Sequence, residues 1–377
     1  MKKGCFINCI SMPNDDAIQS SGVMKKVFSQ IKTLRTQFEV DHILVNTYGR
    51  KENIVSKLKR RVPFCAVDNK WTYTSEVDGY DFIFFRKSDI DYTVFKFLKK
   101  IKNNNPCCKI IFEIPTYPYE KENFHGKKDF PLWVKDYVNR KRLIKCVDRI
   151  VTYSEDDIIF GIPTLQLKNG FDFSTVAPRR ISRDYNPNEI NIIAVASFSE
   201  AHGYDRVLVG LGEYYKKGGM RNIQLHLVGG GVCIKQYEEI VERYHLDKHV
   251  IFYGWQSGIK LDEIYDKADV ALDILAGFRK GIYSCSSLKS RECVAKGLPI
   301  VGACKIDFIS DDYPYLLQIP HDDSPADMEL LIQFVDNVYK KRTLEEVANE
   351  IREYGIQKCD IKTTLQPVVD YIMQDTK

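Results

Sequence analysis

The sequence lacks an apolar run long enough to cross a bilayer, which takes about 18 consecutive residues. Its apolar stretches are short and resemble strands, as in CFINCI, Cys5–Ile10. The start, MKKGCFINCISMPNDD, has two lysines but turns polar at once, so we interpret it as a first strand and not as a signal peptide. The chain also has no low-complexity tract and no short-period repeat.

The cysteines lack the spacing of a metal site. There are eleven, with Cys107 and Cys108 adjacent and most of the others inside apolar runs. An odd number in apolar surroundings indicates reduced, partly buried thiols and favours a cytoplasmic protein.

Net charge is also small, at +4, but it is unevenly distributed. Residues 1–180 hold 32 Lys and Arg against 21 Asp and Glu, a net charge of +11, whereas residues 181–377 carry −7. This asymmetry suggests that the first half meets something anionic. A solvated, lysine-rich face is an equally good interpretation.

Short β-rich runs alternate with helical stretches throughout the 377 residues. Such alternation predicts an α/β protein with parallel sheets covered by helices on both faces. The length fits two domains, and the polar segment PRRISRDYNPNEIN is a plausible linker between them. We therefore expect two doubly wound, Rossmann-like domains, at 1–178 and 179–359, with ligands at the carboxyl ends of their strands.

The stretch SSLKSRECVAKGLPIV, residues 286–301, is typical of a helix that starts at a binding site. Ser286 and Ser287 can cap it, and the free amides around Leu288 favour a phosphate. Lys289 adds positive charge, and Glu292, one turn further on, suits the two hydroxyls of a ribose. This describes a nucleotide diphosphate site; a capped surface helix with a Lys–Glu pair is the alternative.

Glycines follow two predicted strands of the second half, where a backbone must approach a ligand closely. They are Gly203, after His202, and Gly229 and Gly230 in LHLVGGG. With LKNGFD at 167–172, these segments resemble, in order and spacing, the retaining glycosyltransferases of family 4. The resemblance covers nearly the whole chain and is strongest over 167–305, and FEIPTYPYEKE, 112–122, is similar to a segment of bacterial members that build capsule or exopolysaccharide.

The resemblance implies a GT-B fold, in which two Rossmann-like domains face each other across a cleft. It implies a nucleotide-sugar donor in the second domain and an acceptor in the first. The family's signature is a Glu, seven residues and a second Glu, and the second matches Glu292, which would hold the donor ribose. The first falls on Ser284, and the family's Arg and Lys near the diphosphate fall on Phe198 and His202.

Other groups must then stabilise the leaving diphosphate. Lys289 is the first candidate, and Arg279 and Lys280 come next. His202 can donate from a neutral imidazole or carry charge beside an anion, although a turn residue packed on Tyr204 is the alternative. Trp255, after a strand, is expected against the base or in ordinary packing.

In the first domain, Ser21 and Gly22 open a helix where the family has a glycine-rich loop, and an ordinary N-cap is the alternative. Arg86 follows a strand and can point toward an acceptor or into solvent. Glu113 is the best carboxylate here, for orienting an acceptor hydroxyl or stabilising the sugar, with a structural turn as its alternative. The short pattern Asp89-Ile-Asp91 recurs by chance and is discounted as a metal motif.

Residues 127–146 mix basic and apolar side chains and suit either an anionic membrane surface or ordinary helix packing. The last segment, about 360–377, is expected by resemblance to form a helix that packs back on the first domain.

The sequence as a whole predicts a cytoplasmic glycosyltransferase, peripheral to the membrane, that transfers sugar from UDP- or GDP-sugar to a glycan, with a lipid-linked acceptor favoured, in surface polysaccharide synthesis. Configuration would be retained, and neither a metal cofactor nor nucleic acid is implied. The departing phosphate can take the acceptor's proton, so no base residue is needed. The alternatives are an inactive relative that binds a glycan or partner, and a sugar-nucleotide epimerase.

Overall fold

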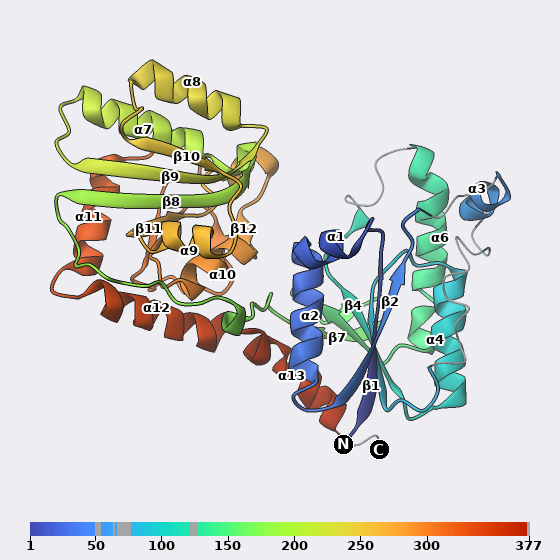
Figure 1. The fold of residues 1–377 in the computed structure, drawn as a ribbon. Coiled ribbons are helices and arrows are strands. Elements are labelled where there is room, and N and C mark those ends of the chain that lie inside the picture. The colour runs from blue at the N-terminus through green and yellow to red at the C-terminus, as the bar shows by residue number, and fades with distance from the viewer. Residues whose placement is uncertain (50–53, 63–64, 66–76, 121–126, 375–377) are drawn as a thin grey trace. The chain divides into compact units, whose positions relative to one another are not determined.

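The computed structural model describes residues 1–49, 54–62, 65, 77–120 and 127–374 (Figure 1). The chain divides into two compact units, which are treated separately below. Unit 1 comprises Met1–Gly170 and Thr364–Lys377, and unit 2 comprises Phe171–Thr363. The sequence placed the boundary at residue 178, whereas the units divide after Gly170.

Unit 1 is built on a seven-stranded sheet of order β2-β1-β3-β4-β5-β7-β6. All neighbouring pairs are parallel except β6 and β7, which form an antiparallel ribbon. The strands are β1 (Lys3–Ile10), β2 (Glu39–Asn46), β3 (Phe82–Arg86), β4 (Lys109–Ile114), β5 (Arg149–Thr152), β6 (Ile158–Ile159) and β7 (Ile162–Gln166). The run CFINCI lies in β1, as expected from the sequence.

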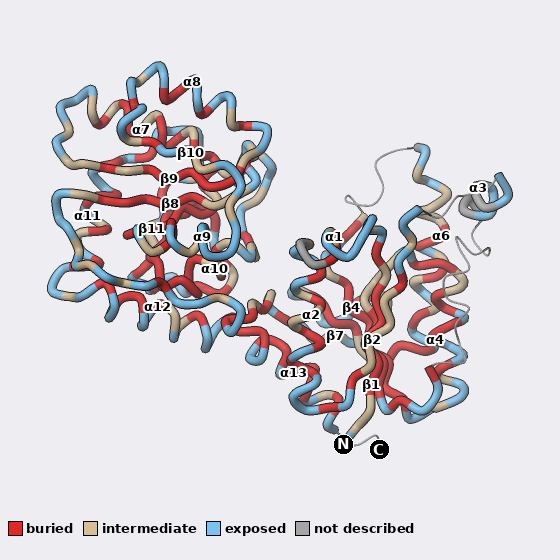
Figure 2. The backbone as a smooth tube through the Cα atoms, in the orientation of Figure 1, coloured by how far each residue is buried: buried red, intermediate tan, exposed pale blue. Residues whose placement is uncertain are grey.

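Helices cover both faces of this sheet. They are α1 (Asp15–Ser20), α2 (Gly22–Leu34), α3 (Ile54–Arg61), α4 (Tyr92–Asn104), α6 (Phe130–Arg140) and α13 (Ile361–Met373). On one face α2 and α13 share a core with Phe82 and Phe84, and on the other α4 packs over Phe85 and Phe112. Between them, strands β1, β3, β4 and β5 are mostly buried (Figure 2). Asp91 caps α4 by accepting from the amides of Thr93 and Val94, so it has a structural role.

Unit 2 has a six-stranded, wholly parallel sheet of order β10-β9-β8-β11-β13-β15 and a small β12-β14 pair. The strands are β8 (Glu189–Phe198), β9 (Asn222–Gly231), β10 (Val250–Gly254), β11 (Val270–Leu272), β12 (Ser284–Cys285), β13 (Ile300–Gly302), β14 (Lys305–Ile306) and β15 (Leu316–Gln318). The chain runs outward from β8 to β10 and then returns to β11 on the other side. Strand order therefore reverses between β8 and β11, which is where such sheets bind ligands.

The helices of unit 2 are α7 (Tyr204–Lys216), α8 (Ile234–Tyr244), α9 (Ile259–Tyr265), α10 (Leu288–Ala295), α11 (Met328–Tyr339) and α12 (Leu344–Cys359). α7 and α8 cover one face of the sheet, and α10 and α12 cover the other (Figure 1). This is the doubly wound arrangement that the alternation predicts.

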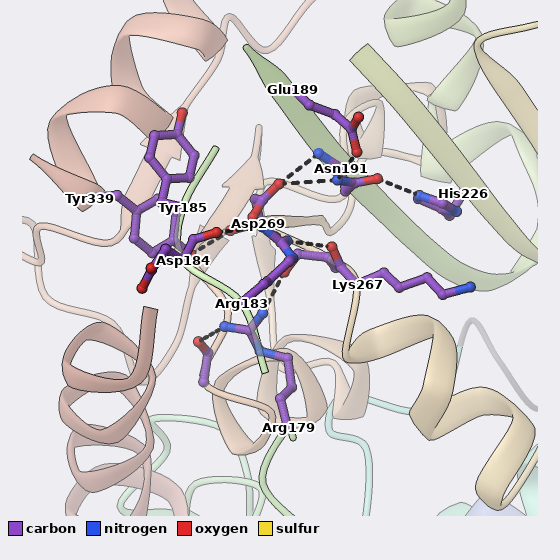
Figure 3. Close-up of polar contacts among 12 residues, drawn as sticks. Arg179, Arg183, Asp184, Tyr185, Glu189, Asn191, His226, Lys267, Asp269 and Tyr339 are labelled. Atoms are coloured by element: carbon purple, nitrogen blue, oxygen red, sulfur yellow. Dashed lines mark hydrogen bonds and ion pairs between the residues drawn. The ribbon is translucent and has the colours of Figure 1, made fainter. Parts of the chain in front are cut away.

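The polar segment interpreted as a linker is instead fixed to unit 2 (Figure 3). Arg183 donates to the buried Asp269 carboxylate at 2.6 Å, and Asp269 in turn accepts from the backbone of Asn191 at 2.8 Å. Arg179 donates to the carbonyls of Lys296 and Gly297, and the ring of Tyr185 stacks on Tyr339. The polar composition of this segment suggested an exposed linker. Composition is misleading here because the polar groups pair with partners that are distant in sequence.

None of the helices that the structure describes has the length and apolar content needed to span a membrane. All eleven cysteines are free thiols.

Candidate functional site

A polar cluster lies at the carboxyl edge of the unit 2 sheet, at the point where strand order reverses. Asp273 follows β11, and His202 closes the short turn η5 (Glu200–His202) after β8. Ser287 and Lys289 come from the start of α10, whose first turn carries the backbone amides expected to face an anion. The cluster is therefore assembled from three segments far apart in sequence.

Ser287 caps α10 as the sequence predicted, and the structure adds a carboxylate that holds the cap. The Ser287 hydroxyl accepts from the Ser290 amide at 3.1 Å and donates to Asp273 at 3.4 Å. Ser290 donates its own hydroxyl to Asp273 at 2.5 Å. Asp273 is buried, so these hydrogen bonds fix the start of α10 against the end of β11.

Arg291 braces the same turn from behind. Its fully buried guanidinium donates to the Ser287 carbonyl at 2.9 Å and to both carboxylate oxygens of Asp307, at 2.9 and 2.7 Å. Ser286 donates to Asp307 at 2.8 Å. Much of the polarity in SSLKSRE thus stabilises the start of the helix itself, and Lys289 is the basic residue of the segment outside this network.

Lys289 supplies the positive charge of the cluster. Its ammonium donates to the Tyr204 hydroxyl at 3.1 Å, its one hydrogen-bond partner within the described part of the chain. Two of its three N–H groups therefore remain for an anion. Burial lowers the pKa of Lys289, and the nearby Asp273 carboxylate acts in the opposite direction. An arriving phosphate would stabilise the protonated form further.

His202 is a neutral hydrogen-bond donor. Its Nδ1 accepts from the Ser199 amide at 3.0 Å, so in the neutral ring the proton is on Nε2. Burial, followed by the charge of Lys289, lowers the pKa of His202 to about 4. Its ring stacks on Tyr204, as in the packing alternative, with centroids 5.6 Å apart. Packing and donation from Nε2 are compatible, whereas a charged imidazolium is disfavoured.

The glycines are required by packing inside unit 2. A Cβ at Gly203, which has a φ of 65°, would lie 2.5 Å from the Ala276 Cβ. A Cβ at Gly229 would lie 1.9 Å from the Ala196 carbonyl oxygen. Trp255 lies beside Gly230 with its side chain 70% exposed, so ordinary core packing does not explain it.

Arg279 and Lys280, the second candidates for the missing cations, are paired within unit 2. Arg279, in the turn η6 (Gly277–Lys280), donates to both oxygens of Asp205 at 2.9 and 2.8 Å and also contacts Asp323 at 2.6 Å. Lys280 pairs with Glu200 at 2.8 Å. Neither presents a free charge, which leaves Lys289 as the stronger candidate.

Known structures share this architecture. HepE of Anabaena, solved with UDP and glucose, is 12% identical and has a TM-score of 0.58, with 99% of each chain covered. Sucrose-phosphate synthase of Thermosynechococcus elongatus is 14% identical, with a TM-score of 0.58 over 99% of each chain. A glycosyltransferase of Rickettsia africae is 10% identical, with a TM-score of 0.60 over 100% of this chain and 99% of that one.

The chain has the GT-B fold. No protein-family model matches the sequence, and no curated protein matches it. The identities are too low for the likeness to show more than the fold.

Within this GT-B chain, the remaining donor residues predicted from the sequence lie around α10. Leu288 is its first residue, partly exposed, and Glu292 is one turn further on, half-buried. Ser284 lies on β12, exposed and paired with Lys305 of β14. The described residues contain no group of three His, Cys, Asp or Glu side chains arranged to hold a metal ion.

Glu113, the carboxylate predicted for unit 1, lies near the end of β4 and accepts hydrogen bonds from three buried or partly buried side chains. One of its oxygens accepts from Tyr153 at 2.6 Å and Gln30 at 2.9 Å, and the other accepts from Arg86 at 2.5 Å. Its side chain is fully buried. Burial alone would raise the pKa of Glu113, but Arg86 and the other donors lower it below its usual value. This geometry favours the structural alternative for Glu113, and it pairs Arg86 with Glu113 instead of leaving its guanidinium in solvent.

Breaking this pair is expected to be costly. Arg86→Met leaves a buried carboxylate without its cation and should destabilise unit 1 by about 3–5 kcal/mol in urea unfolding near neutral pH. Because the lowered pKa of Glu113 stabilises the fold above its unfolded pKa, the deficit should shrink as acid protonates the carboxylate. The double variant Arg86→Met/Glu113→Gln is the control and should recover much of the loss; a double variant as unstable as the single one would contradict the pairing.

Ser21 has the N-cap role that was the alternative, and Gly22 is the first residue of α2. The Ser21 hydroxyl accepts from the Met24 amide at 3.4 Å, and a Cβ at Gly22 would meet no atom within 4 Å. The helix start is thus capped and sterically open.

Sequence reasoning missed Asp273 and the Arg291–Asp307 brace. Asp273 could have been predicted, because it is an acidic residue directly after the strand-like run ADVAL, and ligands are expected at the carboxyl ends of strands. No pattern in the sequence links Arg291 to Asp307, because their proximity depends on the β12-β14 pair.

Proposed function

We propose that the protein is a glycosyltransferase that binds a nucleotide-diphosphate sugar at the carboxyl edge of unit 2. The observation that carries the proposal is the half-buried Lys289 ammonium, with two N–H groups open, at the capped start of α10. It lies at the reversal of strand order, where the fold binds ligands. HepE, with the same fold, was solved with UDP and with UDP-glucose.

In this proposal the diphosphate is held by the α10 amides, Lys289 and the Nε2–H of His202. These donors stabilise the charge that develops as the diphosphate leaves, without the aid of a metal. Glu292 accepts from the ribose hydroxyls, and Trp255 covers the base, which we expect to be uracil or guanine. Glu113 and Arg86 position the strand ends of unit 1 rather than contact the sugar.

We further propose transfer with retention to a hydroxyl of a glycan, with a lipid-linked acceptor and a role in surface polysaccharide synthesis. The sequence resemblance to family 4 supports these finer points. A departing phosphate oxygen can accept the acceptor's proton, which fits a site whose histidine is a donor and not a base. The free thiols of all eleven cysteines support a cytoplasmic location.

The test is a thermal-shift screen of nucleotide sugars followed by product analysis. UDP or GDP at a hundredfold excess over its Kd should stabilise the protein by about 2.7 kcal/mol. Glu292→Ala should weaken binding of the nucleoside diphosphate, while affinity for inorganic pyrophosphate should stay unchanged because the ribose contact is absent there. Equal loss for both ligands would contradict the role of Glu292. No stabilisation by any nucleotide would exclude the donor site.

A further inference from the structure

Unit 1 exposes apolar side chains on two helices that contact each other. On α3 and just after it, Ile54, Val55, Leu58 and Val62 follow helical spacing and are all exposed, with Ile54 at 79% and Leu58 at 60%. Isolated exposed apolar residues are ordinary, but a row along one helix is not.

The neighbouring helix α6 adds an aromatic ladder. Phe130 and Trp133 stack with ring centroids 5.9 Å apart, and Trp133 and Tyr137 stack at 5.2 Å. Phe130 is 62% exposed, so the ladder opens to solvent at the start of α6. The amphipathic rings of Trp133 and Tyr137 favour the boundary between water and hydrocarbon, and the phenyl ring of Phe130 is apolar.

The two helices are fastened together by a buried lysine. Lys135 of α6 donates to the carbonyl of Lys59, in the last turn of α3, at 2.9 Å and to the carbonyl of Cys65 at 2.8 Å. An ammonium at these carbonyls satisfies the end of α3 and complements its dipole. The contacts of Lys135 therefore hold the end of α3 against α6, while Ile54, Val55 and Leu58 of α3 stay exposed to solvent.

The sequence of these two helices is rich in basic residues. Residues 54–62 contain four basic and no acidic residues, and residues 127–145 contain seven basic and two acidic. Two of these charged side chains, Lys135 and Asp136, are buried, so they offset each other and do not contribute to the exposed charge. Lys141 lies 4.0 Å from the Tyr137 ring centroid and donates to its hydroxyl. Apolar rows flanked by cations are typical of helices that lie in the surface of an anionic bilayer.

We propose that α3 and the aromatic side of α6 form a docking face for an anionic phospholipid bilayer. The docking face is defined by Ile54, Val55, Leu58, Val62, Phe130, Trp133 and Tyr137. The apolar residues enter the headgroup boundary while Lys59, Lys128 and Lys141 meet lipid phosphates. This goes beyond the proposed donor chemistry, and it is independent of it because docking needs no nucleotide.

The experiment is flotation of the full chain with vesicles, without nucleotide. Wild-type protein should float with vesicles that contain phosphatidylglycerol and much less with pure phosphatidylcholine, and salt should weaken the binding. Ile54→Glu/Leu58→Glu should lower the partition coefficient roughly tenfold or more, because it replaces two inserting side chains with anions. Circular dichroism checks that the variant is folded.

A matched control separates insertion from a change in net charge. Ile259→Glu/Leu330→Glu adds the same two charges at exposed positions of unit 2, where Ile259, 73% exposed, begins α9 just as Ile54 begins α3. It should leave flotation nearly unchanged. Equal loss in both double variants, or no wild-type flotation, would overturn the proposal. So would self-association that Ile54→Glu/Leu58→Glu abolishes, since a second copy would then be the occupant. UDP-induced thermal shifts, measured in parallel, test the donor site separately.

Discussion

Lys289→Met is expected to remove most of the stabilisation that UDP gives to the protein. A hydrogen bond to a charged group contributes about 1.5–3 kcal/mol, so losing the ammonium should raise the Kd roughly 10- to 100-fold. At a UDP concentration a hundred times the wild-type Kd, stabilisation should fall from about 2.7 to between about 0.4 and 1.4 kcal/mol. Calorimetry of apo and UDP-bound protein measures both quantities.

The apo variant should stay folded with a melting temperature close to that of the wild type. The lowered pKa of Lys289 means that its charged form is less favourable in the folded chain than in the unfolded one. Replacing the charge relieves that cost below the folded pKa, and it offsets the loss of the hydrogen bond to Tyr204. Binding and stability are thus expected to separate, which distinguishes a ligand contact from a structural lysine.

Lys248→Met is the matched control. Lys248 is exposed and precedes β10 at the amino edge of the same sheet, away from α10. The variant should keep the full UDP response. A Lys289→Met protein that still gains about 2.7 kcal/mol from UDP would remove the start of α10 as the diphosphate site.

How much of the fold was predictable depends on strand length. The buried runs that became β1, β3, β4, β8 and β9 are five to ten residues long and rich in Ile, Val and Phe, a pattern that indicates parallel strands. β6, β12 and β14 have two residues each, too few to show any period. They form because neighbouring strands offer free backbone groups, and the sequence does not show those neighbours.

The error over the linker has a related cause. Arg179, Arg183 and Tyr185 look like solvent-facing residues, because such side chains are exposed unless they find partners. Their partners are carbonyls near Lys296 and the carboxylates of Asp269 and Asp336. Burial of a polar side chain is decided by tertiary pairing, so a polar segment does not identify a domain boundary.

The candidate site was predictable where it depends on local structure. Ser287 and the first turn of α10 follow from capping rules, and the structure places them as expected. The neutral state of His202 did not follow, since it depends on the Ser199 amide and on burial beside Lys289. The local part of a binding site is thus readable from sequence, while its protonation states need the packed structure.

Asp273→Asn is expected to shift the pH dependence of UDP binding toward acid. Asp273 is the nearby carboxylate that opposes the lowering of the Lys289 pKa by burial. Without its charge the pKa of Lys289 falls further, so the ammonium loses its proton at lower pH and affinity declines earlier as pH rises. UDP affinity measured between about pH 7 and pH 10 should show this alkaline limb displaced to lower pH.

Asparagine has the shape of aspartate but one acceptor oxygen, so the hydrogen bonds of Ser287 and Ser290 are partly kept, at a cost of about 1 kcal/mol in stability. Loss of stability alone would lower affinity equally at every pH. Asp323→Asn removes an equal charge from the exposed partner of Arg279 and should leave the limb in place. An unmoved limb in Asp273→Asn, or equal movement in both variants, would mean that Asp273 holds α10 without tuning Lys289. A displaced limb in Asp273→Asn alone would show that the charge on Lys289 is set by the residue that follows β11.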